Sequence, residues 1–338
     1  MNRISWIDNA RALCILWVVC IAHLSEYTIL DLHSPFEIVL SKGVLFVLFF
    51  ISGWGFRNRC FDSKSDVINF IKTRLIRLYP LYLAGLVMMF AVSKEYGYSY
   101  VVDMKQFIYS LLCMASIVPP PPSTLWYINV LFAFYAVTPL IKRVSNTKNC
   151  KSIILILLIL LVIFRFTSID FDIRILYYFP LYCIGLSFNK FEKILTEFSY
   201  KKIVVVMIAL TFLCKINILI SNISYFHCKW LFEIIVLWGI GIASIAFIVP
   251  VCSKLPKRIS KILSIISYSS LCIFLFHRPF YATIVHFSEG KLPIAVAYGV
   301  LFPGLILLSY IAQKGYDLII KRLKMIKKYD IKVKDWMQ

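Results

Sequence analysis

Charged side chains are scarce in this sequence. They make up 16% of the 338 residues, whereas 60% of the residues are hydrophobic and the mean hydropathy is +0.81. A soluble domain seldom exceeds about 50% apolar residues, because polar groups must cover its surface. The composition therefore excludes a soluble globular protein. Apolar runs of about 17–25 residues recur along the whole chain instead, and each is long enough to cross the hydrocarbon core of a bilayer.

Several other features are missing as well. The ten cysteines contain no Cys-x-x-Cys pair and lie mostly in apolar segments, so we expect neither a disulfide framework nor a metal site. The first apolar run has no small-residue cleavage site and further spans follow it, which excludes a cleavable signal peptide. Long apolar runs also exclude the short alternating segments of a membrane β-barrel. The inverted pair of interrupted spans that is typical of secondary transporters is not evident.

The sequence predicts an all-α, polytopic membrane helical bundle of about ten transmembrane helices. The expected spans are 11–30, 38–56, 78–94, 124–142, 152–168, 173–189, 202–220, 230–251, 262–285 and 293–313. A less apolar stretch, 103–117, predicts a short helix outside the membrane. It leads into four prolines at 119–122, which cannot continue a helix.

The 37 Lys and Arg residues outnumber the 17 Asp and Glu residues, and they gather in alternate loops. The N-terminal segment, the loops after spans two, four, six and eight, and the C-terminal tail are basic. The positive-inside rule places all of these, and therefore both termini, in the cytoplasm. A membrane thus explains the charge better than nucleic acid does. We expect one membrane domain over residues 1–314, and a basic tail over 315–338 that lies against anionic headgroups.

His23 lies deep inside the first span, in the stretch RALCILWVVCIAH. If Arg11 marks the cytoplasmic boundary, a helix that rises 1.5 Å per residue places His23 about 18 Å into the bilayer. Ionisable residues at that depth are costly and usually functional. Two interpretations are open. His23 is either a neutral histidine hydrogen-bonded between helices, or a general base that accepts a proton.

Arg74 and Arg77 lie at the cytoplasmic mouth of the third span, and their spacing of three places them on one helical face. Such a pair suits a phosphate or diphosphate group, although it also fits plain anchoring at the cytoplasmic boundary. His277, late in the ninth span, either binds an acceptor or occupies the membrane interface. Trp126 starts the fourth span, as an aromatic belt residue does. The small residues of FFISGWGF, 49–56, predict close helix packing.

These segments together resemble a known family. ISWIDNARALCILWVVCIAH is similar to the opening of the acyltransferase-3 membrane proteins, and most of all to the branch called fucose 4-O-acetylase-like or surface-glycan O-acetyltransferases. LFFISGWGF resembles the second span of that family, RLIRLYPLY its Arg-x-x-Arg motif, and LWYINVLF and SYSSLCIFLFHRPF its later signatures. The five motifs occur in the family's order and cover most of the chain.

The resemblance implies that His23 is the catalytic base, that Arg11 is its motif partner, and that Arg74 and Arg77 bind the coenzyme A donor. In the family ten residues separate the basic residue from the histidine, whereas eleven do so here. Twelve steps of a regular helix end about 120° from the start, so Arg11 and His23 would not share a face. A one-residue π-bulge would restore the register; otherwise Arg11 has a looser role.

The implied function is a membrane O-acyltransferase, which moves an acetyl group from acetyl-CoA to a sugar hydroxyl of a surface polysaccharide or its lipid-linked precursor. We expect acetyl-CoA as a donor substrate, no permanently bound cofactor or metal, and a place in a bacterial inner membrane. His277 and Trp126 are candidate acceptor contacts. One alternative is an exporter of a glycan or lipid-linked sugar, and another is an inactive relative within a glycan-assembly complex. The side on which the acceptor is modified stays open.

Overall fold

The computed structural model describes residues 5–29, 34–101, 103–145, 158–160, 162–163, 171–187, 196–222, 229–288 and 290–322. Its helices are α1 (Ser5–Leu16), α2 (Pro35–Trp54), α3 (Lys64–Tyr96), α4 (Met104–Leu111), α5 (Trp126–Ser145), α7 (Arg174–Leu186), α9 (Tyr200–Ser221), α10 (Lys229–Ser253), α11 (Lys257–Phe287), α12 (Ile294–Val296) and α13 (Phe302–Arg322). A π-helical segment, η1 (Trp17–His23), and a 3-10 turn, η2 (Leu24–Tyr27), continue α1. A second π-helical segment, η4 (Ala297–Leu301), joins α12 to α13.

The all-α, polytopic membrane fold predicted from the sequence is confirmed. Seven helical segments in the described part of the chain are long and apolar enough to cross a membrane, and they coincide with the first three and the last four predicted spans. The fourth predicted span corresponds to α5, and the sixth to α7, which has only 13 residues. The fifth, 152–168, lies mostly outside the described residues. The short helix expected within 103–117 is α4.

The end of the predicted membrane domain falls inside a helix. Residue Lys314 lies within α13, which continues to Arg322. The remainder of the predicted basic tail, 323–338, lies outside the described residues.

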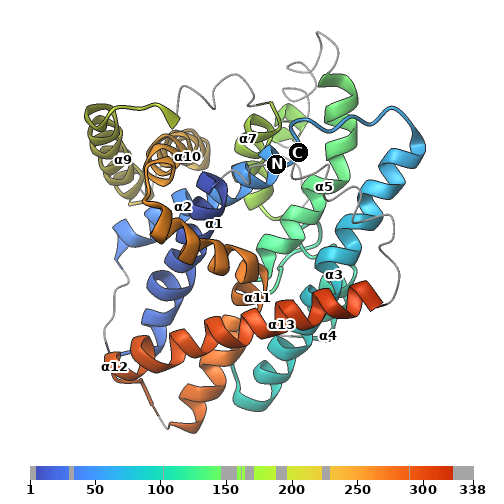
Figure 1. Ribbon diagram of the computed structural model, residues 1–338, viewed down its shortest axis with the longest axis vertical. Helices are drawn as coiled ribbons and strands as arrows, with labels where there is room; N and C mark the ends of the chain where they lie inside the picture. The colour runs from blue at the N-terminus through green and yellow to red at the C-terminus, as the bar shows by residue number, and fades with distance from the viewer. Residues whose placement is uncertain are drawn as a thin grey trace.

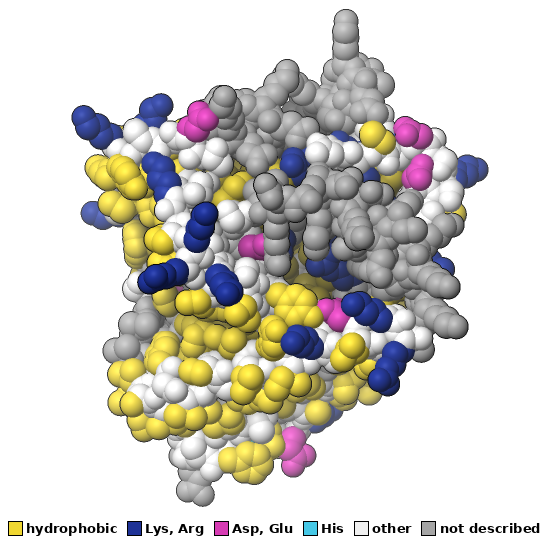
Figure 2. Space-filling model, viewed as in Figure 1, with side chains coloured by type: hydrophobic (Ala, Val, Ile, Leu, Met, Phe, Trp, Pro, Cys, Tyr) yellow, Lys and Arg dark blue, Asp and Glu magenta, His cyan; other side chains and the backbone are white. Residues whose placement is uncertain are grey.

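One end of the bundle gathers the basic connections, and we call it the basic end. There α1 begins, α2 ends and α3 begins. Lys142 near the end of α5 donates to the Arg57 carbonyl at 2.7 Å, and Asn9 on α1 donates to the Cys252 carbonyl of α10 at 3.0 Å. In Figure 2 the Lys and Arg side chains lie in the upper and middle parts of the view and over the right-hand end of α13, whereas hydrophobic side chains predominate at the lower left, over α12 and the start of α13. This grouping is the one that the positive-inside rule requires.

Helix α1 lies inside the bundle, packed against α2, α10 and α11 (Figure 1). Helix α11 in turn contacts α3 and α13, so it bridges the first span and the C-terminal half of the chain. Because protein rather than lipid surrounds α1, its polar side chains can find partners there. This arrangement places Arg11 and His23 against α11, where both are partly buried.

Two glycines allow α2 and α7 to touch through their backbones. A Cβ atom on Gly53 would lie 2.2 Å from the Tyr182 carbonyl oxygen, and one on Gly185 would lie 2.3 Å from the Phe50 carbonyl oxygen. Neither backbone oxygen can move aside as a flexible side chain would. The close packing predicted for FFISGWGF is therefore confirmed at Gly53.

We expect Gly53→Ala to destabilise the protein by about 1–3 kcal/mol, the usual effect of overpacking a tight core. Thermal unfolding of the purified protein in detergent measures the change. The matched control is Gly304→Ala in α13, where a Cβ would meet nothing within 4 Å. An unchanged melting temperature for Gly53→Ala would show that α2 and α7 can separate freely.

Candidate active site

The first span is not a regular helix, and its irregular part precedes His23. The seven residues of η1, Trp17–His23, form a π-helical segment, which holds more residues per turn than an α-helix. Arg11 Nη1 lies 3.5 Å from Ser267 Oγ, and His23 Nδ1 lies 2.7 Å from His277 Nε2. Arg11 and His23 thus both contact α11. The sequence predicts a π-helical irregularity between Arg11 and His23, because eleven rather than ten residues separate them. The structure contains such a segment in η1.

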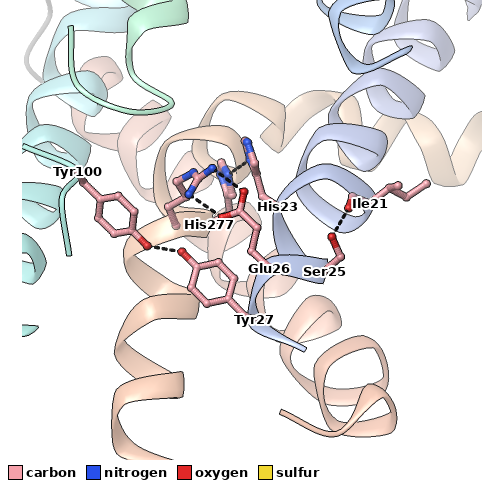
Figure 3. A network of polar contacts seen from close by, with 8 residues as sticks. Ile21, His23, Ser25, Glu26, Tyr27, Tyr100 and His277 are labelled. Atoms are coloured by element: carbon pink, nitrogen blue, oxygen red, sulfur yellow. Dashed lines mark hydrogen bonds and ion pairs between the residues drawn. The ribbon is translucent and has the colours of Figure 1, made fainter. Parts of the chain in front are cut away.

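His23 and His277 form a hydrogen-bonded pair, which we call the histidine pair (Figure 3). Their rings are parallel within 7°, with centroids 4.9 Å apart, as expected for a bond in the ring plane. The Nδ1 atom of His277 lies 2.7 Å from the Phe274 carbonyl oxygen. His277 is completely buried in the protein interior. The prediction that it occupies the membrane interface is therefore wrong.

The hydrogen-bond directions assign the tautomers of the histidine pair. A carbonyl oxygen only accepts, so His277 donates from Nδ1 to Phe274 and its Nε2 is an acceptor. His23 must then donate from Nδ1 to His277 Nε2. In this tautomer the second nitrogen of His23, Nε2, carries a lone pair and is the basic atom.

An ion pair joins Glu26, three residues after His23, to Arg278, the residue directly after His277. Arg278 on α11 donates to Glu26 on η2 through two bonds, of 2.9 and 3.0 Å, so the contact is bidentate. The hydroxyls of Tyr27 and Tyr100 meet beside it (Figure 3). Burial raises the pKa of Tyr100, so its hydroxyl keeps its proton in this contact. Glu26 is not among the residues predicted from the sequence, although an acidic residue three positions after an intramembrane histidine is a signal for it.

A cavity of about 70 Å³ opens beside His23. About 10–15 Å³ of such space holds one water molecule, so this cavity suits a small group such as a short acyl chain. The residues that line it come from the first span, α2, α5 with the segment before it, and α11: Val18, Ala22, His23, Ser41, Leu45, Thr124, Trp126 and Phe274. We call this space the His23 pocket.

Of the two candidate acceptor contacts, Trp126 lines the His23 pocket and His277 does not. His277 lies behind His23 instead, as its hydrogen-bond partner. The Trp126 ring also lies 4.4 Å from the guanidinium of Arg174, which is paired with Asp172 at 2.7 Å. The start of α7 thus supports the ring that forms one wall of the pocket.

Three arginines gather nearer the basic end, and we call Arg11, Arg74 and Arg77 the arginine cluster. The Tyr135 hydroxyl interacts electrostatically with all three, and Arg11 also with Arg77. Arg74 is buried, with its guanidinium 4.8 Å from the Phe56 ring. Arg77 is exposed, and the Arg11 side chain is 31% exposed. The two arginines of α3 therefore differ in accessibility although they are close in sequence.

Aromatic residues of α5 lie between the arginine cluster and the histidine pair. Tyr127 interacts electrostatically with Arg11, and its ring centroid lies 5.2 Å from that of Phe274. Phe274 lines the His23 pocket and accepts the hydrogen bond from His277. Tyr127 and Phe274 thus connect α5 to the pocket and to the histidine pair on the side that faces Arg11. No group of three or more His, Cys, Asp or Glu residues that could hold a metal ion occurs in the described segments.

Comparison with known proteins gives one match. A family model described as an acyltransferase domain, of the acyltransferase-3 type, matches residues 4–314. The matched region includes the histidine pair, the arginine cluster and every residue that lines the His23 pocket. No curated protein and no solved structure matches the chain.

Proposed function

The chain belongs to the acyltransferase-3 family of membrane acyltransferases, and on this basis we propose that it transfers an acetyl group from acetyl-CoA to a sugar hydroxyl. The acceptor is a surface polysaccharide or its lipid-linked precursor, and the protein resides in the inner membrane of a bacterium. The observation that carries this proposal is the histidine pair, which directs a basic nitrogen of His23 away from His277 at the edge of a small pocket.

The proposed reaction uses His23 as a general base. The acceptor oxygen attacks the thioester carbonyl carbon while His23 Nε2 takes the hydroxyl proton. The new C–O bond forms, the C–S bond to CoA breaks, and the proton passes from His23 to the leaving sulfur. His277 supports the cationic state of His23, because a hydrogen bond from a charged donor is stronger than one from a neutral donor.

The arginine cluster is the proposed site for the CoA phosphates. Guanidinium groups match the geometry of phosphate oxygens, and Arg77 and Arg11 are accessible. The donor enters from the basic end, which lies in the cytoplasm. Its thioester then reaches the His23 pocket past the aromatic residues of α5.

The position of the pocket favours an acceptor that arrives from the opposite side of the membrane. Trp126 is the first residue of α5, and Ser41 lies near the start of α2. Both helices start at the end of the bundle away from the basic end. Donor and acceptor therefore approach His23 from opposite faces, and the acyl group crosses the bilayer within the protein.

Mass spectrometry of the host's surface glycan tests the proposed function. We expect deletion of the gene and His23→Gln each to remove one acetyl mass per repeat unit, because loss of a general base slows transfer about 10²–10⁴-fold. His286→Gln is the matched control, since His286 lies on α11 but stacks on Tyr96 away from the pair. All variants are compared at equal membrane abundance.

Three outcomes contradict the proposal in different ways. If deletion stops glycan export and leaves acetylation of the remaining glycan unchanged, the protein is an exporter. If deletion removes the acetyl group but His23→Gln does not, the base is another residue. If deletion changes neither, the acceptor is not a surface glycan.

The tautomer assignment predicts the behaviour of His277 variants. His277→Phe removes the acceptor for His23 Nδ1–H, so we expect a rate loss of roughly 10–100-fold, as for other residues that orient a functional histidine. His277→Gln restores an acceptor oxygen and should recover part of the rate. Initial rates with acetyl-CoA measure both. Equal rates for the two variants would mean that His277 only fills space.

If the arginine cluster binds the donor, a substitution in it should change the KM for acetyl-CoA rather than kcat. Arg77→Gln should raise KM for acetyl-CoA about tenfold or more with little change in kcat, because a hydrogen bond to a charged group contributes about 1.5–3 kcal/mol. Lys72→Gln, at another exposed position of α3, is the control. A fall in kcat at unchanged KM would place Arg77 outside the donor site.

A further inference from the structure

Thr124 combines two features that are unfavourable by themselves. Its φ is 64°, in the left-handed region that a β-branched residue seldom adopts. Thr124 is only 6% exposed, and its hydroxyl has no hydrogen-bond partner within the described part of the chain. A buried hydroxyl without a partner costs free energy, and so does left-handed backbone at such a residue. A structural role for Thr124 accounts for neither.

The location of Thr124 suggests a role for both its left-handed backbone and its unpaired hydroxyl. Thr124 lines the His23 pocket, as do Trp126 and Phe274. It stands two residues before α5, in a segment held by backbone bonds. The Trp126 amide donates to the Pro122 carbonyl at 3.1 Å, and the Tyr127 amide donates to the Thr124 carbonyl at 3.3 Å. Thr124, whose buried hydroxyl has unused hydrogen-bonding capacity, is thus part of the wall of the pocket that His23 also lines.

We propose that Thr124 is a catalytic residue whose hydroxyl donates a hydrogen bond to the carbonyl oxygen of the acyl group in the His23 pocket. This inference rests on the proposed function. During transfer the carbonyl oxygen gains negative charge as the acceptor oxygen adds to the carbon, and loses it when the C–S bond breaks. The acceptor proton moves to His23 and then to sulfur, whereas Thr124 keeps its own proton throughout.

The physical argument is preorganisation. A donor stabilises developing charge most when it is already desolvated and does not have to leave another partner first. The Thr124 hydroxyl meets both conditions. The histidine pair cannot serve in this way, because His277 directs its own donor to Phe274 and His23 directs its donor to His277. The pocket therefore needs a separate donor for the oxyanion, and Thr124 is positioned to supply it.

Substitutions at Thr124 separate the hydroxyl from the backbone strain. Thr124→Ser keeps the hydroxyl, Thr124→Val keeps the shape without it, and Thr124→Gly relieves the strain and also lacks it. The measurement is the initial rate of [14C]acetyl transfer from [14C]acetyl-CoA to the native acceptor in host membranes, at equal protein abundance. Binding of acetyl-CoA to the purified variants and their melting temperatures are measured alongside.

We expect Thr124→Ser to transfer acetyl within about threefold of the wild-type rate. Thr124→Val and Thr124→Gly should lose about 10²–10³-fold in rate, as on removal of an oxyanion donor elsewhere, with unchanged affinity for acetyl-CoA. Thr124→Gly should melt no lower than the wild-type protein, so its loss of rate cannot be assigned to unfolding. Thr138→Val is the matched control, because the Thr138 hydroxyl is already bonded to Phe134 and Tyr182.

A wild-type rate in Thr124→Gly, or in a folded Thr124→Val, would overturn the inference. His23→Gln in the same membranes distinguishes this result from failure of the proposed function. If wild-type membranes transfer acetyl and His23→Gln membranes do not, the Thr124 result stands by itself. If wild-type membranes transfer no acetyl to any glycan, the proposed function fails first.

Discussion

The hydrogen bond between His23 and His277 is the contact on which the rest of the site depends. It joins residues 254 positions apart, and it requires both to face one another inside the membrane. The π-helical segment η1 turns His23 towards α11, and the Glu26–Arg278 ion pair closes the next turn against the same helix. An isolated imidazole in hydrocarbon would be unfavourable, whereas His23 and His277 are bonded to one another and His277 is also bonded to the Phe274 carbonyl.

The interior position of α1 explains why so many polar residues of this span are tolerated. Asp8 accepts a bond from Ser267 at 2.8 Å, and Asn9 is bonded to α10 and to Ser260 on α11. These contacts, together with those of Arg11, fix the position of α1 along the axis of α11 near the basic end. The histidine pair fixes it again farther along. Because two separate levels are fixed, the geometry of the pair does not depend on one contact alone.

Much of the fold could be predicted from the sequence, because apolar length and alternating loop charge are local signals. The π-helical segment could also be anticipated, since one residue too many in a motif must be absorbed somewhere. The partners of His23 could not be predicted, because no local pattern links the first span to α11. His277 was considered an acceptor contact or an interfacial residue for that reason, and Glu26 and Thr124 were not considered. The hydroxyl of Thr124 gains its meaning only from a pocket built by four separate segments.

The backbone contact between α2 and α7 has a mechanical consequence. The main chains of α2 and α7 touch at Gly53 and Gly185, so the two helices cannot slide past one another. They behave as one rigid unit, and α2 packs against α1. Any opening that admits a bulky molecule must come from elements that are less tightly held. The candidate spans with the smallest buried share are Tyr200–Ser221 and Ile294–Arg322, at 22% each. Most of each of these two spans is not buried inside the protein, and that leaves them more freedom to move than α2 and α7 have.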